Sequence, residues 1–207
     1  MTSKLTETQI YEKFADIVAA SLRVERERVT MDAHLMDDLG GESLDLIEIT
    51  METESAFDIW LPEKSILDTA AEVFGPGVLV QDGVLTEAGK ELLRRRMPPE
   101  NGHLFEGEVT VKALSSYFLT VRSWVALIER LREYTPLACD ACGGPLKAET
   151  GFRMQCTLCQ KQVSLRSGED LNRDWVKQYY DQEYLPSKAA DPQAADTQGE
   201  PMSTASL

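Results

Sequence analysis

The sequence predicts a mainly α-helical protein that is followed by a small β-rich module. Apolar residues recur at helical spacing over residues 6–22, 44–57 and 120–131. Four cysteines gather with several glycines in residues 139–159, where no helical pattern is present. An Asp-Gly pair at residues 82–83 lies between short apolar runs and indicates a β-hairpin among the helices.

The first predicted helix spans residues 6–22 and presents one apolar face. Its apolar side chains are spaced for a buried stripe and are Ile10, Phe14, Ile17, Val18 and Leu22. We expect this stripe to form part of a helical core.

A serine stands at the start of the second predicted helix, in the run Asp-Leu-Gly-Gly-Glu-Ser-Leu-Asp. Gly40 and Gly41 permit a tight turn, which places Ser43 at or beside the helix N-cap. The hydroxyl is then exposed, and the positive end of the helix dipole favours an anion there. A phosphodiester attached to Ser43 would suit this position, although a plain capping serine is the alternative.

The second helix carries two patterned faces. Asp45, Glu48 and Glu52 recur at intervals of three and four residues and form one acidic face beside Ser43. A second, apolar face consists of Leu44, Ile47 and Met51, which we expect to point into the core.

Further elements follow along the chain. A short third helix is expected at residues 62–69, with Pro62 in its first turn. The hairpin at residues 78–85 precedes a helix at residues 87–97, for which Thr86 is the expected cap. The best match to a fourth bundle helix lies at residues 120–131, so residues 75–118 read as an insertion.

Residues 29–61 resemble the acyl carrier proteins. Their counterparts to the family pattern are Val29-Thr30, Asp37-Asp38-Leu39-Gly40, Glu42-Ser43-Leu44 and the acidic helix ending at Phe57. Glu42 replaces the aspartate that usually precedes the family's serine. The resemblance implies a four-helix acyl-carrier-like bundle in which Ser43 accepts 4′-phosphopantetheine from coenzyme A.

The same resemblance implies a function. The arm carries acyl groups as thioesters in fatty-acid, polyketide or specialised lipid biosynthesis, and the chain itself is not an enzyme. Asp45, Glu48 and Glu52 would dock a phosphopantetheinyl transferase and acyltransferase- or ketosynthase-type enzymes through charge steering. Gly40-Gly41-x-Ser43 is also similar to peptidyl carriers, so an aminoacyl or peptidyl carrier is an alternative. An unmodified protein-interaction module is another.

The four cysteines form two Cys-x-x-Cys pairs separated by 13 residues. This spacing predicts a zinc ribbon in which Cys139, Cys142, Cys156 and Cys159 hold one Zn²⁺. The alternatives are two disulfides, which are disfavoured in a cytosolic protein, or a redox pair, which needs a βαβ setting. Residues 135–170 hold four basic and four acidic residues, so the predicted ribbon lacks the basic face expected of a nucleic-acid binder.

Composition supports an acidic carrier. The net charge is −14, and residues 1–70 hold 16 acidic against 6 basic residues, which disfavours binding to nucleic acid. No apolar stretch is long enough for a membrane span and no secretion signal is indicated, so we expect a cytoplasmic protein. The predicted division is an acyl-carrier-like domain at 1–134, the ribbon at 135–170, a packing segment at 171–184 and a disordered tail at 185–207.

Overall fold

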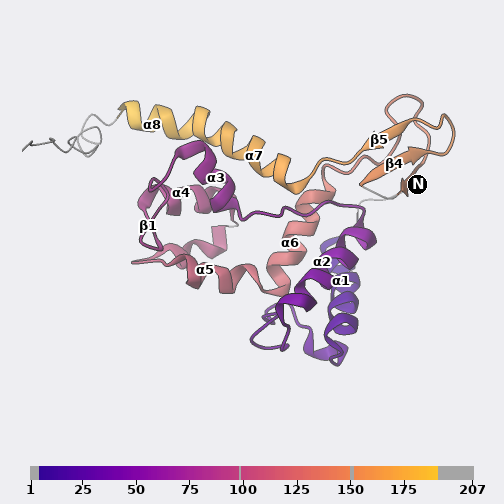
Figure 1. The fold of residues 1–207 in the computed structure, drawn as a ribbon, viewed down its shortest axis with the longest axis horizontal. Coiled ribbons are helices and arrows are strands. Elements are labelled where there is room, and N and C mark those ends of the chain that lie inside the picture. The colour runs from indigo at the N-terminus through magenta and orange to yellow at the C-terminus, as the bar shows by residue number, and fades with distance from the viewer. Residues whose placement is uncertain (1–4, 98, 150–151, 191–207) are drawn as a thin grey trace, which may run out of the picture.

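The computed structural model describes residues 5–97, 99–149 and 152–190, which are mainly helical with two small antiparallel sheets (Figure 1). The predicted fold class, mainly helical with a small sheet in the C-terminal part, is confirmed. The buried apolar side chains fall into two clusters, which we call the first core and the second core.

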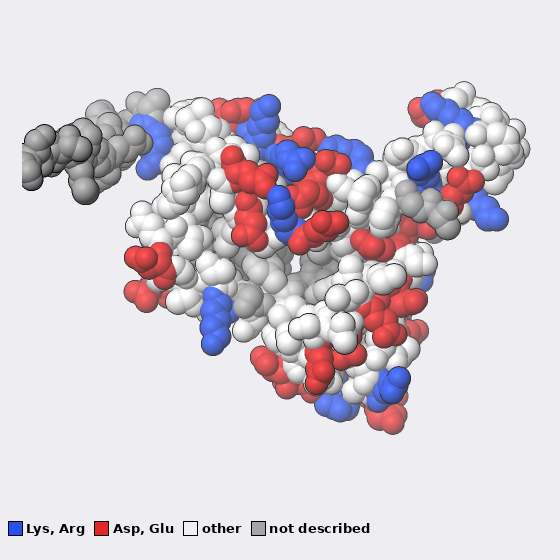
Figure 2. Space-filling view, in the orientation of Figure 1, with Lys and Arg blue, Asp and Glu red and all other residues white. Residues whose placement is uncertain are grey.

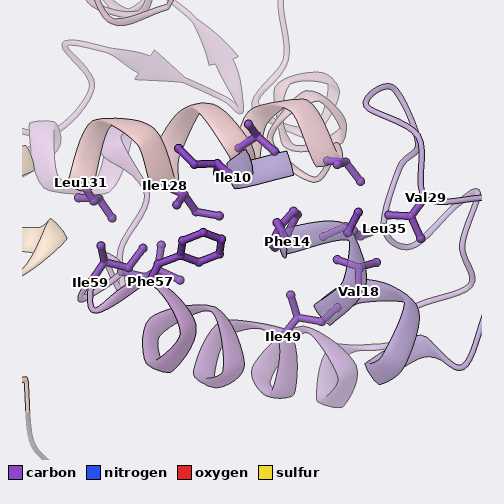
Figure 3. Packing of buried hydrophobic residues seen from close by; sticks show 14 of the residues in the cluster. Ile10, Phe14, Val18, Val29, Leu35, Ile49, Phe57, Ile59, Ile128 and Leu131 are labelled. Carbon is purple, nitrogen blue, oxygen red and sulfur yellow. The ribbon is translucent and has the colours of Figure 1, made fainter. Parts of the chain in front are cut away.

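The first core is built by α1 (Glu7–Leu22), α2 (Ser43–Phe57) and α6 (Val121–Arg132). Each helix contributes a stripe at spacings of three and four residues, as shown by Ile10, Phe14 and Val18 of α1. These stripes meet one another (Figure 3). Val29, Leu35 and other loop residues close the ends of the cluster, and η1 (Arg26–Arg28) lies in the loop after α1.

The second core holds most of the predicted insertion. It contains α3 (Ile66–Phe74), β1 (Val80–Gln81), β2 (Val84–Leu85), α4 (Glu87–Arg96), η2 (Pro99–Phe105) and α5 (Val111–Phe118). The predicted hairpin is present, because β1 pairs antiparallel with β2 around Asp82 and Gly83, which both have positive φ. The Thr86 hydroxyl caps α4 by accepting the N–H of Gly89.

The third helix differs from its prediction in position and in packing. It begins at Ile66 rather than Pro62, because the Ser65 hydroxyl accepts the N–H of Asp68 and caps the helix there. Its buried residues Leu67 and Phe74 belong to the second core. The first core is closed instead by the non-helical segment that contains Ile59 and Leu61.

The C-terminal sheet has the order β3 (Leu146–Glu149), β4 (Arg153–Cys156), β5 (Gln162–Ser164). Both pairs are antiparallel, and the residues opposite each other include Leu146 and Cys156. The sheet contacts the segment that closes the first core, because the ring of Phe152, just before β4, stacks on Trp60 with centroids 4.3 Å apart.

The described part of the chain ends in a long helical segment that runs along α3 (Figure 1). It contributes Leu171 to the first core and Val176 and Tyr179 to the second core. It consists of α7 (Gly168–Tyr179), a π-helical turn η3 (Tyr180–Tyr184) and α8 (Leu185–Ala190). Helix α7 therefore begins before the predicted boundary at residue 171, because the Ser167 hydroxyl caps it. Residues 185–190, which were predicted to belong to a disordered tail, are helical, and residues 191–207 of that tail lie outside the described residues.

We expect Trp60→Ala to loosen the C-terminal sheet from the first core. A stacked aromatic pair contributes about 0.5–1.5 kcal/mol beyond its buried area. Amide hydrogen exchange in β4 and β5 should therefore accelerate, while exchange in α1 stays slow. Trp60→Phe keeps a ring under Phe152 and serves as the control. Unchanged exchange in Trp60→Ala would contradict a role for this stack.

In the described part of the chain, no helix combines the length and apolarity that crossing a membrane requires.

Candidate functional site

The turn before Ser43 is held by backbone hydrogen bonds. Gly41 donates its N–H to the Leu35 carbonyl over 2.9 Å, and a Cβ at Gly41 would lie 2.8 Å from that oxygen. Leu35 in turn donates to the Leu119 carbonyl over 2.9 Å. The glycine at position 41 is therefore required by close approach, and the turn is anchored to the junction of α5 and α6.

Ser43 is the first residue of α2, immediately after the N-cap Glu42. The backbone N–H of Glu42 is occupied, since it donates to the Asp45 carboxylate over 2.8 Å. The Ser43 side chain is exposed, and its hydroxyl has no hydrogen-bond partner among the described residues. The serine is thus accessible, and the adjacent helix N-terminus favours an attached anion.

The acidic residues of α2 divide into two roles. Asp45 is half-buried and holds the first turn of the helix through its bond to Glu42. Glu48 and Glu52 are exposed and form no ion pair within the described residues. Glu54 is half-buried and accepts the N–H of Leu61, so among the described residues of α2 the carboxylates of Glu48 and Glu52 are the ones free to meet a partner protein.

The prediction that Leu44, Ile47 and Met51 point into the core is wrong. They are 78%, 56% and 64% exposed, respectively. The buried face of α2 is instead formed by Ile49, Thr53 and Phe57. Both sets of residues are spaced for one helical face, so periodicity alone does not decide between them.

The three exposed side chains form a stripe that begins next to Ser43, and we call it the apolar stripe of α2. Its members Leu44, Ile47 and Met51 share the exposed surface of the helix with Glu48 and Glu52. Exposed apolar residues in a contiguous group are typical of a protein-binding surface.

The four cysteines come together as the spacing predicts. Their sulfur atoms lie within 4.8 Å of one another. The Sγ atoms of Cys139 and Cys159 are 3.7 Å apart, and those of Cys142 and Cys156 are 3.4 Å apart. Four thiolates on one tetrahedral Zn²⁺ have sulfur atoms separated by about 3.8 Å, given Zn–S bonds of about 2.3 Å. The donor set and its spacing fit this metal.

Backbone N–H groups near the cluster stabilise the thiolate form of Cys156. The N–H groups of Leu158 and Cys159 point to the Cys156 Sγ at 3.4 and 3.5 Å. Chiefly because of the bond from Cys159, the pKa of Cys156 is lowered to about 6. The lowered pKa favours the thiolate, which is the form that binds a metal.

The family comparison identifies a prosthetic-group attachment domain. The family model described as "Phosphopantetheine attachment site" matches residues 12–73, which include α1 from Glu12 onward, the anchored turn, α2 and most of α3. Ser43 is the exposed residue at the start of α2 within that match.

Three similar proteins identify the family more narrowly, because all three are acyl carrier proteins. An acyl carrier protein of Chlorobium phaeobacteroides is 38% identical over 60 residues, which cover 29% of this chain and 77% of that protein. One from Syntrophobacter fumaroxidans is 39% identical over 64 residues, covering 30% and 79%. A third, from Guillardia theta, is 41% identical over 59 residues, covering 28% and 73%. The chain belongs to the acyl carrier protein family.

Proposed function

We propose that Ser43 carries a 4′-phosphopantetheine arm and that the arm holds acyl intermediates as thioesters. The observation that carries this proposal is the exposed Ser43 hydroxyl at the first residue of α2, inside the matched segment, which has no hydrogen-bond partner in the described part of the chain. The arm supplies the thiol, and the protein presents the serine and receives partner enzymes. The chain acts as a non-catalytic carrier in fatty-acid, polyketide or specialised lipid biosynthesis.

Partner enzymes dock on the surface of α2 beside the arm. The apolar stripe of α2 supplies desolvated contacts, while Glu48 and Glu52 attract basic patches. The partners are a phosphopantetheinyl transferase and acyl-loading and acyl-processing enzymes of acyltransferase and ketosynthase type. Asp45 contributes to the same acidic surface but acts first as a helix-capping residue.

A charge reversal tests this docking surface. Glu48→Lys with Glu52→Lys should slow arm attachment roughly tenfold or more at low salt, because charge steering raises association rates by about 10–10³-fold. The difference from wild type should shrink as salt rises. Glu106→Lys with Glu108→Lys makes the same charge change at exposed residues outside α2. Equal rates for the two double variants would exclude a docking role for the α2 carboxylates.

The cysteine cluster holds one structural Zn²⁺ through Cys139, Cys142, Cys156 and Cys159. Four protein thiolates leave no open position on zinc, so the metal stabilises the β3–β5 ribbon and supplies no reaction. A module this small buries too little apolar surface to fold without such a staple. The proposed division is a carrier domain at 1–134 with the insertion at 75–118, followed by the ribbon at 135–170 and the segment at 171–184.

The proposed location is the cytoplasm, because cysteines that bind a metal persist as thiols in a reducing compartment.

The class of cargo is tested on the arm-bearing protein. We expect an acyltransferase of fatty-acid or polyketide synthesis to load it from an acyl-coenzyme A, giving a thioester that hydroxylamine cleaves. Loading only by an amino-acid-adenylating enzyme would make the chain an aminoacyl or peptidyl carrier. Failure to receive an arm at all would make it an unmodified interaction module.

A further inference from the structure

A cavity of about 410 Å³ lies between the two cores, where α3, α5 and α6 approach one another. Figure 2 shows the surface hollowed between the two lobes on this face. Its walls are mostly apolar, and they include Leu67, Leu114, Phe118, Trp124 and Leu127.

Three cations line the same cavity: Lys64, which forms a salt bridge with Glu72, and the two arginines Arg96 and Arg130. The Arg96 guanidinium donates to the Asn172 side-chain oxygen over 2.7 Å and lies 4.9 Å from the Trp175 ring centroid. Arg130 donates to the backbone carbonyl of Arg96 over 3.2 Å. Neither guanidinium forms a salt bridge with a carboxylate among the described residues. Burial, followed by the positive charge of Arg130, lowers the pKa of Arg96 to about 10, and the group stays a cation at neutral pH.

Arg130 feels the negative charge of Glu133, but among the described residues neither arginine has a carboxylate within salt-bridge distance. Two such guanidinium groups in a mostly apolar cavity favour one kind of ligand. Partly buried guanidinium groups bind carboxylates through strong charge-assisted hydrogen bonds, and the carboxylate relieves their mutual repulsion. Most of the remaining wall is apolar and suits an apolar body, with Ser65, Ser123 and Asn172 as its polar exceptions besides Lys64.

The cavity extends along the axis of α6. Ser123 and Trp124 line it in the first turn of the helix, and Arg130 lines it seven residues later, about 10 Å along the axis. Leu119 lines the cavity at the first-turn end. Its carbonyl accepts the Leu35 N–H, and the Leu35 carbonyl accepts the N–H of Gly41. The apolar end of the cavity is thus linked to the turn that carries Ser43, and the cationic end is farther along α6.

We infer that this cavity binds a medium-length apolar chain that ends in a carboxylate, with the carboxylate held by Arg96 and Arg130. Two sources offer that chemistry. One is a free fatty acid, and the other is the far end of a dicarboxylic acyl group attached to the arm. The second source rests on the function proposed above, whereas binding of the free acid does not.

The binding site is tested first on full-length Ser43→Ala, which cannot carry an arm. Titration calorimetry with decanoate and with decanol should show that decanoate binds roughly tenfold tighter or better. Arg130→Gln should remove that preference, and Arg95→Gln, whose guanidinium pairs with Glu91 and Glu183 outside the cavity, should retain it. Ala126→Phe, which fills the cavity, should weaken both ligands. Equal affinity for the two ligands, or decanoate binding unaffected by both Arg130→Gln and Ala126→Phe, would overturn the inference.

Wild-type protein that bears the arm then distinguishes a free fatty acid from an arm-bound acyl group as the source of the carboxylate. Loading the arm with an ω-carboxyacyl group should block decanoate binding if the cargo enters the cavity, whereas loading it with a plain acyl group of equal length should not. Blocking by the ω-carboxyacyl group alone assigns the cavity to the cargo. Unblocked decanoate binding assigns it to a free acid. If wild type accepts no arm, the function proposed above fails, and the titration of Ser43→Ala still tests the cavity on its own.

Discussion

Ser43→Ala is expected to gain no phosphopantetheine when it is incubated with coenzyme A, Mg²⁺ and a phosphopantetheinyl transferase. The wild-type chain should gain one arm under the same conditions, as measured by intact mass. The physical reason is that Ser43 presents the hydroxyl that is exposed at the first residue of α2, where an attached phosphodiester meets the positive end of the helix.

Ser55→Ala is the matched control, because Ser55 is also an exposed serine of α2. It should load like wild type. An arm on Ser43→Ala would move the attachment site elsewhere and remove the basis of the proposed function. Loss of loading in Ser55→Ala as well would indicate that any change in α2 disturbs the reaction.

Cys156→Ser is expected to lose the metal and unfold the ribbon. Wild type should contain one Zn²⁺ per chain by elemental analysis, and the variant should contain almost none. Metal binding and folding are coupled in small zinc modules, with apparent binding free energies of about 10–16 kcal/mol in zinc-finger peptides. Amide exchange in β3, β4 and β5 should therefore become fast in the variant.

Ser43 should still be loaded in Cys156→Ser, because the serine turn is anchored to Leu35 and Leu119 and not to the ribbon. Lys161→Gln is the control near the metal, since Lys161 pairs with Asp140 on the surface of the cluster and is not a ligand. Full zinc occupancy in Cys156→Ser would refute the four-cysteine site. Lost loading would show that ribbon and carrier depend on each other.

Elements with local signals could be predicted from the sequence. The apolar spacing of Ile10, Phe14 and Val18, the Asp82-Gly83 turn and the Thr86 cap each act within a few residues, and each is present in the structure. The convergence of the four cysteines was also predictable, because a metal site requires this spacing.

Features that depend on tertiary packing could not be predicted. Helix α2 has two apolar stripes, and the partners that bury Ile49 while leaving Ile47 exposed come from distant helices. The same limit applies to α3, whose apolar side chains suit either core and pack into the second. The cavity joins Arg96 and Arg130, which lie 34 residues apart, so no local pattern indicates it.

Intact-mass analysis of the chain purified from its native host tests the carrier assignment most directly, because it reports the arm and its cargo together. We predict a chain with one phosphopantetheine on Ser43 and a further mass that hydroxylamine removes as an acyl group. A chain that carries no added mass, although an active phosphopantetheinyl transferase is present in the host, would contradict the assignment.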